Sequence, residues 1–156
     1  MTIRRAEYKD IKRILELLIQ VNNVHAEGRP DIFIPDKTKY TGEELEGIIC
    51  DPTTPVFVCV DEEDIVLGYA FCVIKRVIDQ NNLVDHVELY IDDICVDEPM
   101  RGQGVSGRLY DEVMHFARKN AFDRLTLHVW ECNPSAMRFY EKCGMKPYYT
   151  AMEAEL

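Results

Sequence analysis

The sequence predicts an α/β fold: a mixed, mostly antiparallel central sheet of about six or seven strands, flanked by about four helices. Three observations support this fold class. Three apolar runs follow one another with only turn-like breaks, so no helix fits between them. Apolar residues recur at helical spacing early in the chain, and again after a glycine-rich loop. No linker or internal repeat interrupts the 156 residues, which predicts a single domain over residues 1–156.

The first part of the chain predicts one strand and two helices. Ile3–Arg5 indicates a short strand, and Asp10 precedes a helix whose apolar residues share one face: Ile11, Ile14, Leu15, Leu18 and Ile19. Residues 22–41 are polar and contain glycine and prolines, which predicts a loop or a broken helix. Thr41 and Glu44 form a capping-box pattern for a second short helix that ends near Cys50.

The middle of the chain predicts an antiparallel meander. Its three runs are Val56–Val60, Val66–Val77 and Val84–Val96, separated by turn-like breaks at residues 61–64 and 78–82. A helix follows the glycine loop, with its apolar residues on one face: Leu109, Val113, Phe116 and Ala117. Then come a strand over Leu125–Trp130, a helix from Pro134 that ends at Gly144, and a last extended piece over Lys146–Leu156.

Composition predicts a soluble, cytoplasmic protein. The formal net charge of −10 argues against a nucleic-acid partner, and it would attract cationic substrates or simply serve solvation. No apolar run reaches the roughly 20 residues of a membrane span, and the N-terminus lacks a signal peptide's apolar core. The six cysteines form no C-x-x-C pair and indicate free thiols in a reducing compartment; four are expected in core strands, namely Cys59, Cys72, Cys95 and Cys132. No metal site is expected.

The stretch Ile94–Leu109 runs from a buried-looking strand through an Arg/Gly-rich turn into an amphipathic helix. Amides at a helix N-terminus lack intrahelical partners and, with the helix dipole, favour phosphate oxygens. Gly102–Gly107 also matches the dinucleotide-binding pattern G-x-G-x-x-G, but that interpretation fails on context. The loop comes after an antiparallel meander, with room for only one more strand–helix unit. The prediction is therefore a small phosphorylated ligand other than NAD.

Two motifs resemble those of the GCN5-related N-acetyltransferase (GNAT) superfamily. Arg101–Ser106 resembles its pyrophosphate loop, Q/R-x-x-G-x-G/A, and Asn133–Met145 resembles N-x-x-A-x-x-F-Y-x-x-x-G-F. The order of predicted elements is also similar over essentially the whole chain. Ser106 stands where Gly or Ala is usual, and Met145 replaces the usual Phe. Many members close with a two-strand hairpin, whereas only 12 residues follow Gly144 here.

The resemblance implies acetyl-coenzyme A as cosubstrate. Backbone groups of Ile94, Cys95 and Val96 would hold its pantetheine arm, and Asn133 would anchor that arm from the neighbouring strand end. The pyrophosphate would be held by Arg101 together with the loop amides, which belong to Gly102, Gln103, Gly104, Val105, Ser106 and Gly107. Tyr140 matches the tyrosine of the second motif and would be the general acid for the leaving thiolate. The alternative role for Tyr140 is aromatic packing beside Phe139.

The general base is left open among acidic residues of one strand. Asp92 and Asp93 are adjacent, so strand alternation predicts that they point to opposite faces of the sheet. Carboxylates in a buried strand need a partner or a function, and one with a raised pKa could accept a proton from an incoming ammonium. Glu88 is the second candidate, by resemblance to the histone-acetylating branch. His128, on the next strand, is the third.

These features together predict an acetyl-coenzyme A-dependent N-acetyltransferase, an acyltransferase acting on a primary amine of a small molecule through a ternary complex. Residues 90–96 and Glu131 give a weaker resemblance to the diamine and polyamine acetyltransferase branch. The alternatives are a peptide or protein amine acetyltransferase, and a non-catalytic coenzyme A-binding module on the same fold. A homodimer is a plausible assembly, because the short C-terminal end needs covering.

Overall fold

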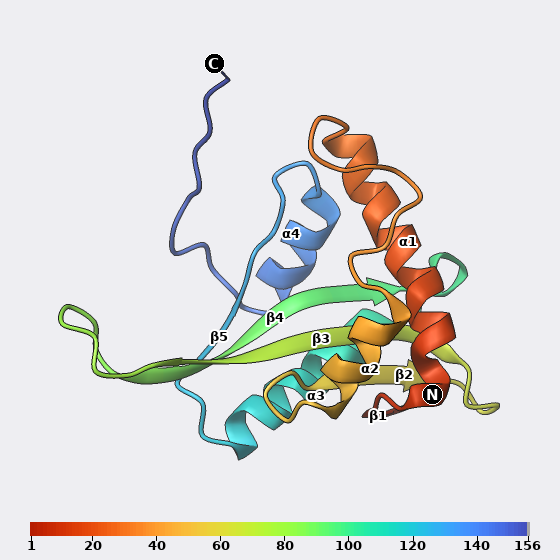
Figure 1. The fold of residues 1–156 in the computed structure, drawn as a ribbon, viewed down its shortest axis with the longest axis horizontal. Coiled ribbons are helices and arrows are strands. Elements are labelled where there is room, and N and C mark those ends of the chain that lie inside the picture. The colour runs from red at the N-terminus through yellow and green to blue at the C-terminus, as the bar shows by residue number, and fades with distance from the viewer. Residues whose placement is uncertain (156) are drawn as a thin grey trace.

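The computed structural model describes residues 1–155, and its sheet carries helices on both faces (Figure 1). Five strands lie in chain order across the sheet: β1 (Thr2–Arg5), β2 (Val56–Val60), β3 (Val66–Val77), β4 (His86–Val96) and β5 (Arg124–Leu127). Neighbours from β1 to β4 are antiparallel, and β5 runs parallel to β4. The helices are α1 (Ile11–Gly28), α2 (Gly42–Cys50), α3 (Val105–Lys119) and α4 (Pro134–Lys142). The predicted fold class is confirmed.

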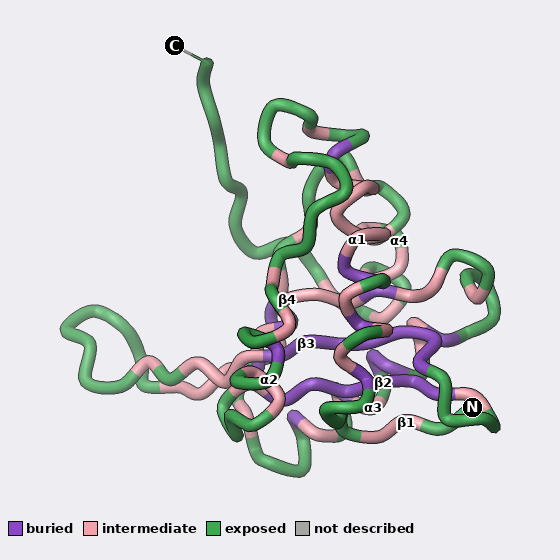
Figure 2. Tube along the Cα trace, turned by 45° about the vertical axis from the view of Figure 1, so that its right-hand side comes forward, coloured by how far each residue is buried: buried purple, intermediate pink, exposed green. Residues whose placement is uncertain are grey.

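Each face of the sheet has its own core, and β2 and β3 appear as buried segments in the middle of the trace (Figure 2). On one face α1 and α2 bury leucine and isoleucine side chains against alternate residues of β2 and β3: Ile14, Leu17, Leu45, Val56, Val58 and Tyr69. On the other face α3 packs on the intervening residues: Phe57, Ala70, Leu89, Ile91, Leu109 and Val113. The period-2 alternation of the strands therefore decides which helix each residue meets.

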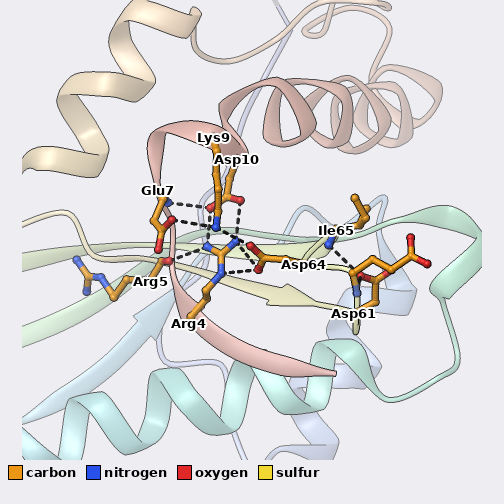
Figure 3. A network of polar contacts seen from close by, with 9 residues as sticks. Arg4, Arg5, Glu7, Lys9, Asp10, Asp61, Asp64 and Ile65 are labelled. Carbon is orange, nitrogen blue, oxygen red and sulfur yellow. Dashed lines mark hydrogen bonds and ion pairs between the residues drawn. The ribbon is translucent and has the colours of Figure 1, made fainter.

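A polar network fixes the start of the chain to the β2–β3 turn (Figure 3). Arg4 donates to both oxygens of Asp10, at 2.7 and 2.9 Å, and its Nε donates to Asp64 at 2.9 Å. Asp10 is only 3% exposed and also accepts from the backbone N–H of Glu7, at 2.8 Å. A buried carboxylate is tolerated here because an arginine and an amide saturate it.

The first helix continues further than the sequence predicted. Residues 22–28 are helical instead of forming a loop, and the chain then returns along the helix. Asn22 Nδ2 donates to Ile34 O at 2.7 Å, and Asn23 Oδ1 accepts from Asp36 N at 2.8 Å. Asn22 and Asn23 thus bind the loop over residues 29–41 to the surface of α1, and the helix continues to Gly28.

The C-terminal part has fewer strands than predicted. The strand count is five and not six or seven, because residues 146–155 form no strand and β5 ends at Leu127. Figure 1 shows this last segment leaving the body of the fold. Pro147 lacks the N–H that a ladder needs, and the outer edge of β5 pairs with no described strand. Leu156, the end of the predicted piece, lies outside the described residues. Cys132 was expected in a core strand, but it lies beyond the end of β5 at Leu127 and is exposed.

Candidate functional site

A β-bulge in β4 places two carboxylates on one face of the sheet. Phe71 pairs with Asp93 and Cys72 pairs with Ile91, so Asp92 is the additional residue of β4. A bulge interrupts the alternation of side chains. Tyr40 Oη donates to Asp92 and Tyr69 Oη donates to Asp93, and both tyrosines pack in the core beneath α1 and α2. The prediction that the two aspartates point to opposite faces was therefore wrong.

Asp93 is a carboxylate with a perturbed pKa. Tyr69 is fully buried, and its hydroxyl donates to Asp93 Oδ2 at 2.6 Å. Burial raises the pKa of Asp93 to about 6, although the hydrogen bond from Tyr69 and the charge of Lys39 both lower it. A carboxylate with a pKa near neutrality can take up a proton and release it again, which is the property of a general base.

Asp92 lies beside a positive charge. Its Oδ2 lies 2.6 Å from Lys39 Nζ and accepts from Tyr40 Oη at 2.8 Å. Burial, followed by this bond to Asp92, raises the pKa of the Tyr40 phenol, so that the hydroxyl remains a donor. The structure thus places Tyr40, from the polar stretch over residues 22–41, against the acidic pair. Asp92 thus already binds an ammonium group.

The other two candidate bases lie further along the same face. Glu88 faces Lys75 across the β3–β4 ladder, with 4.0 Å between Nζ and Oε1. His128 is exposed just after β5, and its Nδ1 lies 3.1 Å from Tyr90 Oη. The hydroxyl of Tyr149 contacts its Nε2. Both ring nitrogens of His128 are therefore engaged by tyrosines, and neither of these candidates is adjacent to the bulge.

Tyr140 extends from α4 into the interior on the α3 side of the sheet. Its ring packs with those of Tyr110 and Phe139, with centroids 6.4 and 5.1 Å away. Burial, and then the charge of Asp93, raise the pKa of the Tyr140 phenol, which stays protonated at neutral pH. Tyr140 also lines a cavity of about 680 Å³ between α3, β5, α4 and the C-terminal segment. Neither the acidic pair nor the loop over residues 101–107 lines that cavity.

The loop over residues 101–107 presents an uncapped helix end. Gly102 and Gly104 have φ values of 78° and 81°, a left-handed conformation that glycine adopts without strain. Gly104 is the N-cap of α3, no side chain caps it, and the first turn contains no acid. The first amide bonded back into the helix is that of Arg108, to Gly104 O at 3.1 Å. The amides of residues 105–107 thus have no partner among residues 1–155.

The space in front of this loop fits a phosphorylated ligand. A Cβ added at Gly102, Gly104 or Gly107 would meet nothing within 4 Å, so the approach to the amides is open. Arg101 is exposed beside them, with Nε 3.4 Å from Val96 O, whereas the side chain of Gln103 turns back to Pro99 O at 3.0 Å. Open amides, a helix N-terminus and an arginine are the donor set that a pyrophosphate requires.

The end of β4 has an open backbone edge. The pairing of β4 with β5 stops at Ile91 and Leu127, whereas pairing with β3 continues to Val96. The amides and carbonyls of Ile94, Cys95 and Val96 that alternate toward β5 are therefore available to a ligand. The Cys95 side chain is buried, with Sγ 3.4 Å from Leu17 O. Asn133 is the N-cap of α4, where Oδ1 accepts from Ala136 N at 3.1 Å.

Sequence reasoning missed two members of the site. Tyr69 has apolar residues or glycine on both sides, and Lys39 lies in a mixed-charge loop, so neither stands out by composition. Tyr69 could have been found from its hydroxyl, because a buried phenol needs a hydrogen-bond partner. The neighbouring strand of the predicted meander carries two aspartates that could accept that bond. Among residues 1–155 no helix is long and apolar enough to cross a bilayer, and no group of three or more His, Cys, Asp or Glu side chains is placed to hold a metal ion.

Comparison with known proteins gives consistent matches. The Acetyltransferase (GNAT) family model matches residues 22–145. A probable N-acetyltransferase, san, of Drosophila melanogaster is 33% identical over 84 residues, which are 53% of this chain but only 42% of that protein. The tetramutant of the BH1408 protein from Bacillus halodurans has a TM-score of 0.95 and 27% identity, with 100% of both chains covered. An acetyltransferase of Trypanosoma brucei shares the fold, with a TM-score of 0.72 and 21% identity over 99% of both chains.

Proposed function

Because the chain belongs to the acetyltransferase (GNAT) family, we propose that it transfers an acetyl group from acetyl-coenzyme A to a primary amine of a small molecule by direct attack in a ternary complex. Membership confirms the resemblance that the two motifs predicted. The family supports acetyl transfer in general, and its usual cosubstrate supplies an activated thioester. The matched relative is a probable N-acetyltransferase, but the match covers less than half of that protein.

The observation that carries this proposal is the pair of unequal carboxylates at the bulge of β4. Asp92 is accessible enough to hold an ammonium, and it already does so with Lys39. Asp93 has a pKa raised by burial to about 6, so it can accept the proton that the ammonium must lose before its nitrogen becomes a nucleophile. On this proposal Asp92 binds the acceptor and Asp93 is the general base, directly or through one water.

The remaining roles follow from the open backbone and from Tyr140. Loop amides of residues 105–107 with Arg101 would bind the pyrophosphate, and the β4 edge at residues 94–96 would align the pantetheine. Tyr140, held protonated by burial, would donate its proton to the departing sulfur. A module that only bound coenzyme A would have no use for a buried, perturbed carboxylate, which favours an enzyme over the non-catalytic alternative.

For the acceptor we favour a di- or polyamine. Glu88, Asp92 and Asp93 follow one another along β4, and the whole chain carries a net charge of −10. A row of carboxylates complements a flexible chain with several ammonium groups and would raise its local concentration. A peptide or protein amine is the second candidate, because a lysine side chain offers the same terminal ammonium. The cytoplasmic location and the homodimer remain predictions of the sequence.

The first test is calorimetric titration with acetyl-coenzyme A, followed by thiol release with a panel of polyamines, amino acids, aminoglycosides and lysine-containing peptides. Saturable binding with release on one amine class would support the proposal and identify that class. Binding without release on any amine would favour the non-catalytic module. Absence of binding would refute the assignment of residues 101–107, and NAD titration of the same sample would test the fingerprint interpretation directly.

A further inference from the structure

One of the protein's own ammonium groups occupies the acidic pair. Lys39 Nζ lies 2.6 Å from Asp92 Oδ2 and 5.3 Å from the centre of the Tyr40 ring. Tyr40 Oη donates to the same carboxylate oxygen at 2.8 Å. The charge of Lys39 also reaches Asp93, since it opposes the rise that burial causes in the pKa of that carboxyl. A carboxylate and an aromatic ring are the two groups that hold an alkylammonium most directly.

The position of Lys39 in the chain makes this contact replaceable. Lys39 belongs to the loop over residues 29–41, on a different element from Asp92, and the two are 53 residues apart. Its side chain remains 49% exposed, whereas that of Asp92 is 18% exposed. Ion pairs with so exposed a partner contribute about 1 kcal/mol or less, so the fold does not depend on this one. An incoming amine can therefore displace Lys39 without unfolding anything.

From this geometry we infer that Lys39 occupies the acceptor-ammonium position from within the chain and is itself an acetylation site; the inference rests on the proposed function. The ammonium loses one proton to Asp93 and then to solvent, and Nζ forms an N–C bond to the thioester carbonyl carbon as the C–S bond breaks. The nitrogen's second surplus proton leaves, and the coenzyme A sulfur gains one. The products are N-acetyl-Lys39, free thiol and one proton released.

Two consequences separate this role from an incidental surface contact. Lys39 competes with external primary amines for Asp92, so it sets the apparent affinity of the acceptor site. Acetylation removes the charge of Lys39, and with it the ion pair that ties the loop to Asp92. The protein that has acetylated itself therefore presents Asp92 free of its internal occupant.

The first experiment incubates the full-length protein with acetyl-coenzyme A alone and follows intact mass and peptide mapping. We expect one acetyl group per chain, on Lys39, at a fractional rate independent of protein concentration. Lys39→Arg keeps the charge but should take up no acetyl group. Lys37→Arg is the matched control, because Lys37 is exposed in the same loop and forms no ion pair with residues 1–155, and it should be modified as wild type is. Equal labelling of Lys37 and Lys39 would overturn the inference.

The second experiment needs no acetyl-coenzyme A. Binding of n-butylamine to the apo protein is followed by NMR shift titration, and Lys39→Met should bind it at least severalfold more tightly than wild type or Lys37→Met. Identical affinities would refute the internal occupant. Turnover on an external amine with Lys39 unmodified would overturn the acetylation site alone. Failure to bind acetyl-coenzyme A would instead overturn the proposed function and the acetylation site. The n-butylamine titration would still test whether Lys39 occupies the ammonium position at Asp92.

Discussion

Replacing Asp93 with asparagine should raise stability, by an amount that grows between about pH 4 and pH 6, and should lower activity above about pH 6. The structure supplies the magnitude. Burial raises the pKa of Asp93 from the usual 3.8 to about 6, a difference equivalent to about 3 kcal/mol. Between these two pH values the unfolded chain ionises while the folded protein keeps its proton, so wild-type stability falls as pH rises. Below about pH 4 both states are protonated and the penalty is absent.

Asp93→Asn removes the charge but keeps an oxygen that can accept from Tyr69 Oη. Its free energy of unfolding in urea should therefore match wild type near pH 4 and exceed it by about 2–3 kcal/mol near pH 8. Activity should change in the opposite direction. The ratio of wild-type to variant kcat/KM cancels the titration of the amine itself, and it should rise from near unity below about pH 5 to about 100 or more above about pH 7.

Loss of stability at every pH would refute the reasoning, and so would an activity ratio that does not vary with pH. Tyr69→Phe gives an independent check, because it removes a hydrogen bond that lowers the pKa of Asp93. The midpoint of the pH profile of kcat/KM for Tyr69→Phe should move to higher pH. The profile of Asp93→Asn should lack this midpoint, because the titrating carboxyl is absent. Asp92→Asn is the neighbouring control, and its effect should fall mainly on KM for the amine.

Three further predictions concern other parts of the molecule. Tyr140→Phe should reduce kcat by about 100-fold or more with the calorimetric affinity for acetyl-coenzyme A nearly unchanged; an equal loss of both would leave only a packing role. Gly104 has a φ of 81°, so Gly104→Ala should lower the free energy of unfolding in urea by about 1–2 kcal/mol and weaken acetyl-coenzyme A binding. Gly47→Ala in α2 is the control: a Cβ there meets nothing within 4 Å, so the same urea titration should show a gain of up to about 1 kcal/mol. Arg4→Met should cost about 3 kcal/mol of unfolding free energy by stranding buried Asp10, and adding Asp10→Ala should recover part of it; no recovery would contradict the pairing.

The sequence predicted the strands well where burial alone decides. Val56–Val60 and Val66–Val77 have the predicted bounds, because runs made mostly of apolar residues have no other place in a small domain than its centre. The helix from Pro134 also ends as expected, with Gly144 at a φ of 88°. The end of β5 was overestimated, since Val129 and Trp130 are apolar but no described strand pairs with them. Pairing depends on a partner, which composition does not reveal.

The residues of the candidate site were easier to predict from the sequence than their arrangement in space. Asp92, Asp93 and Tyr140 were all named from the sequence, but alternation assigned the aspartates to opposite faces. A bulge changes the register by one residue and leaves no mark in composition or periodicity. Lys39 could not be identified either, because its partner is 53 residues away in the chain.

The two irregularities of β4 occur at consecutive positions, and on the proposed function this coincidence brings cosubstrate and acceptor to the same point of the strand. Pairing with β5 stops at Ile91, and the register with β3 shifts at Asp92. The first interruption leaves backbone groups unpaired on one side of the strand, where the proposed cosubstrate would bind. The second irregularity, the bulge, turns the carboxylates of Asp92 and Asp93 toward the face of the sheet that α1, α2 and the loop over residues 29–41 cover. Regular pairing through residues 91–93 would satisfy the backbone and separate the aspartates. On the proposed function, burying Asp93 in this irregular stretch costs stability, and the same burial supplies the raised pKa that a general base needs.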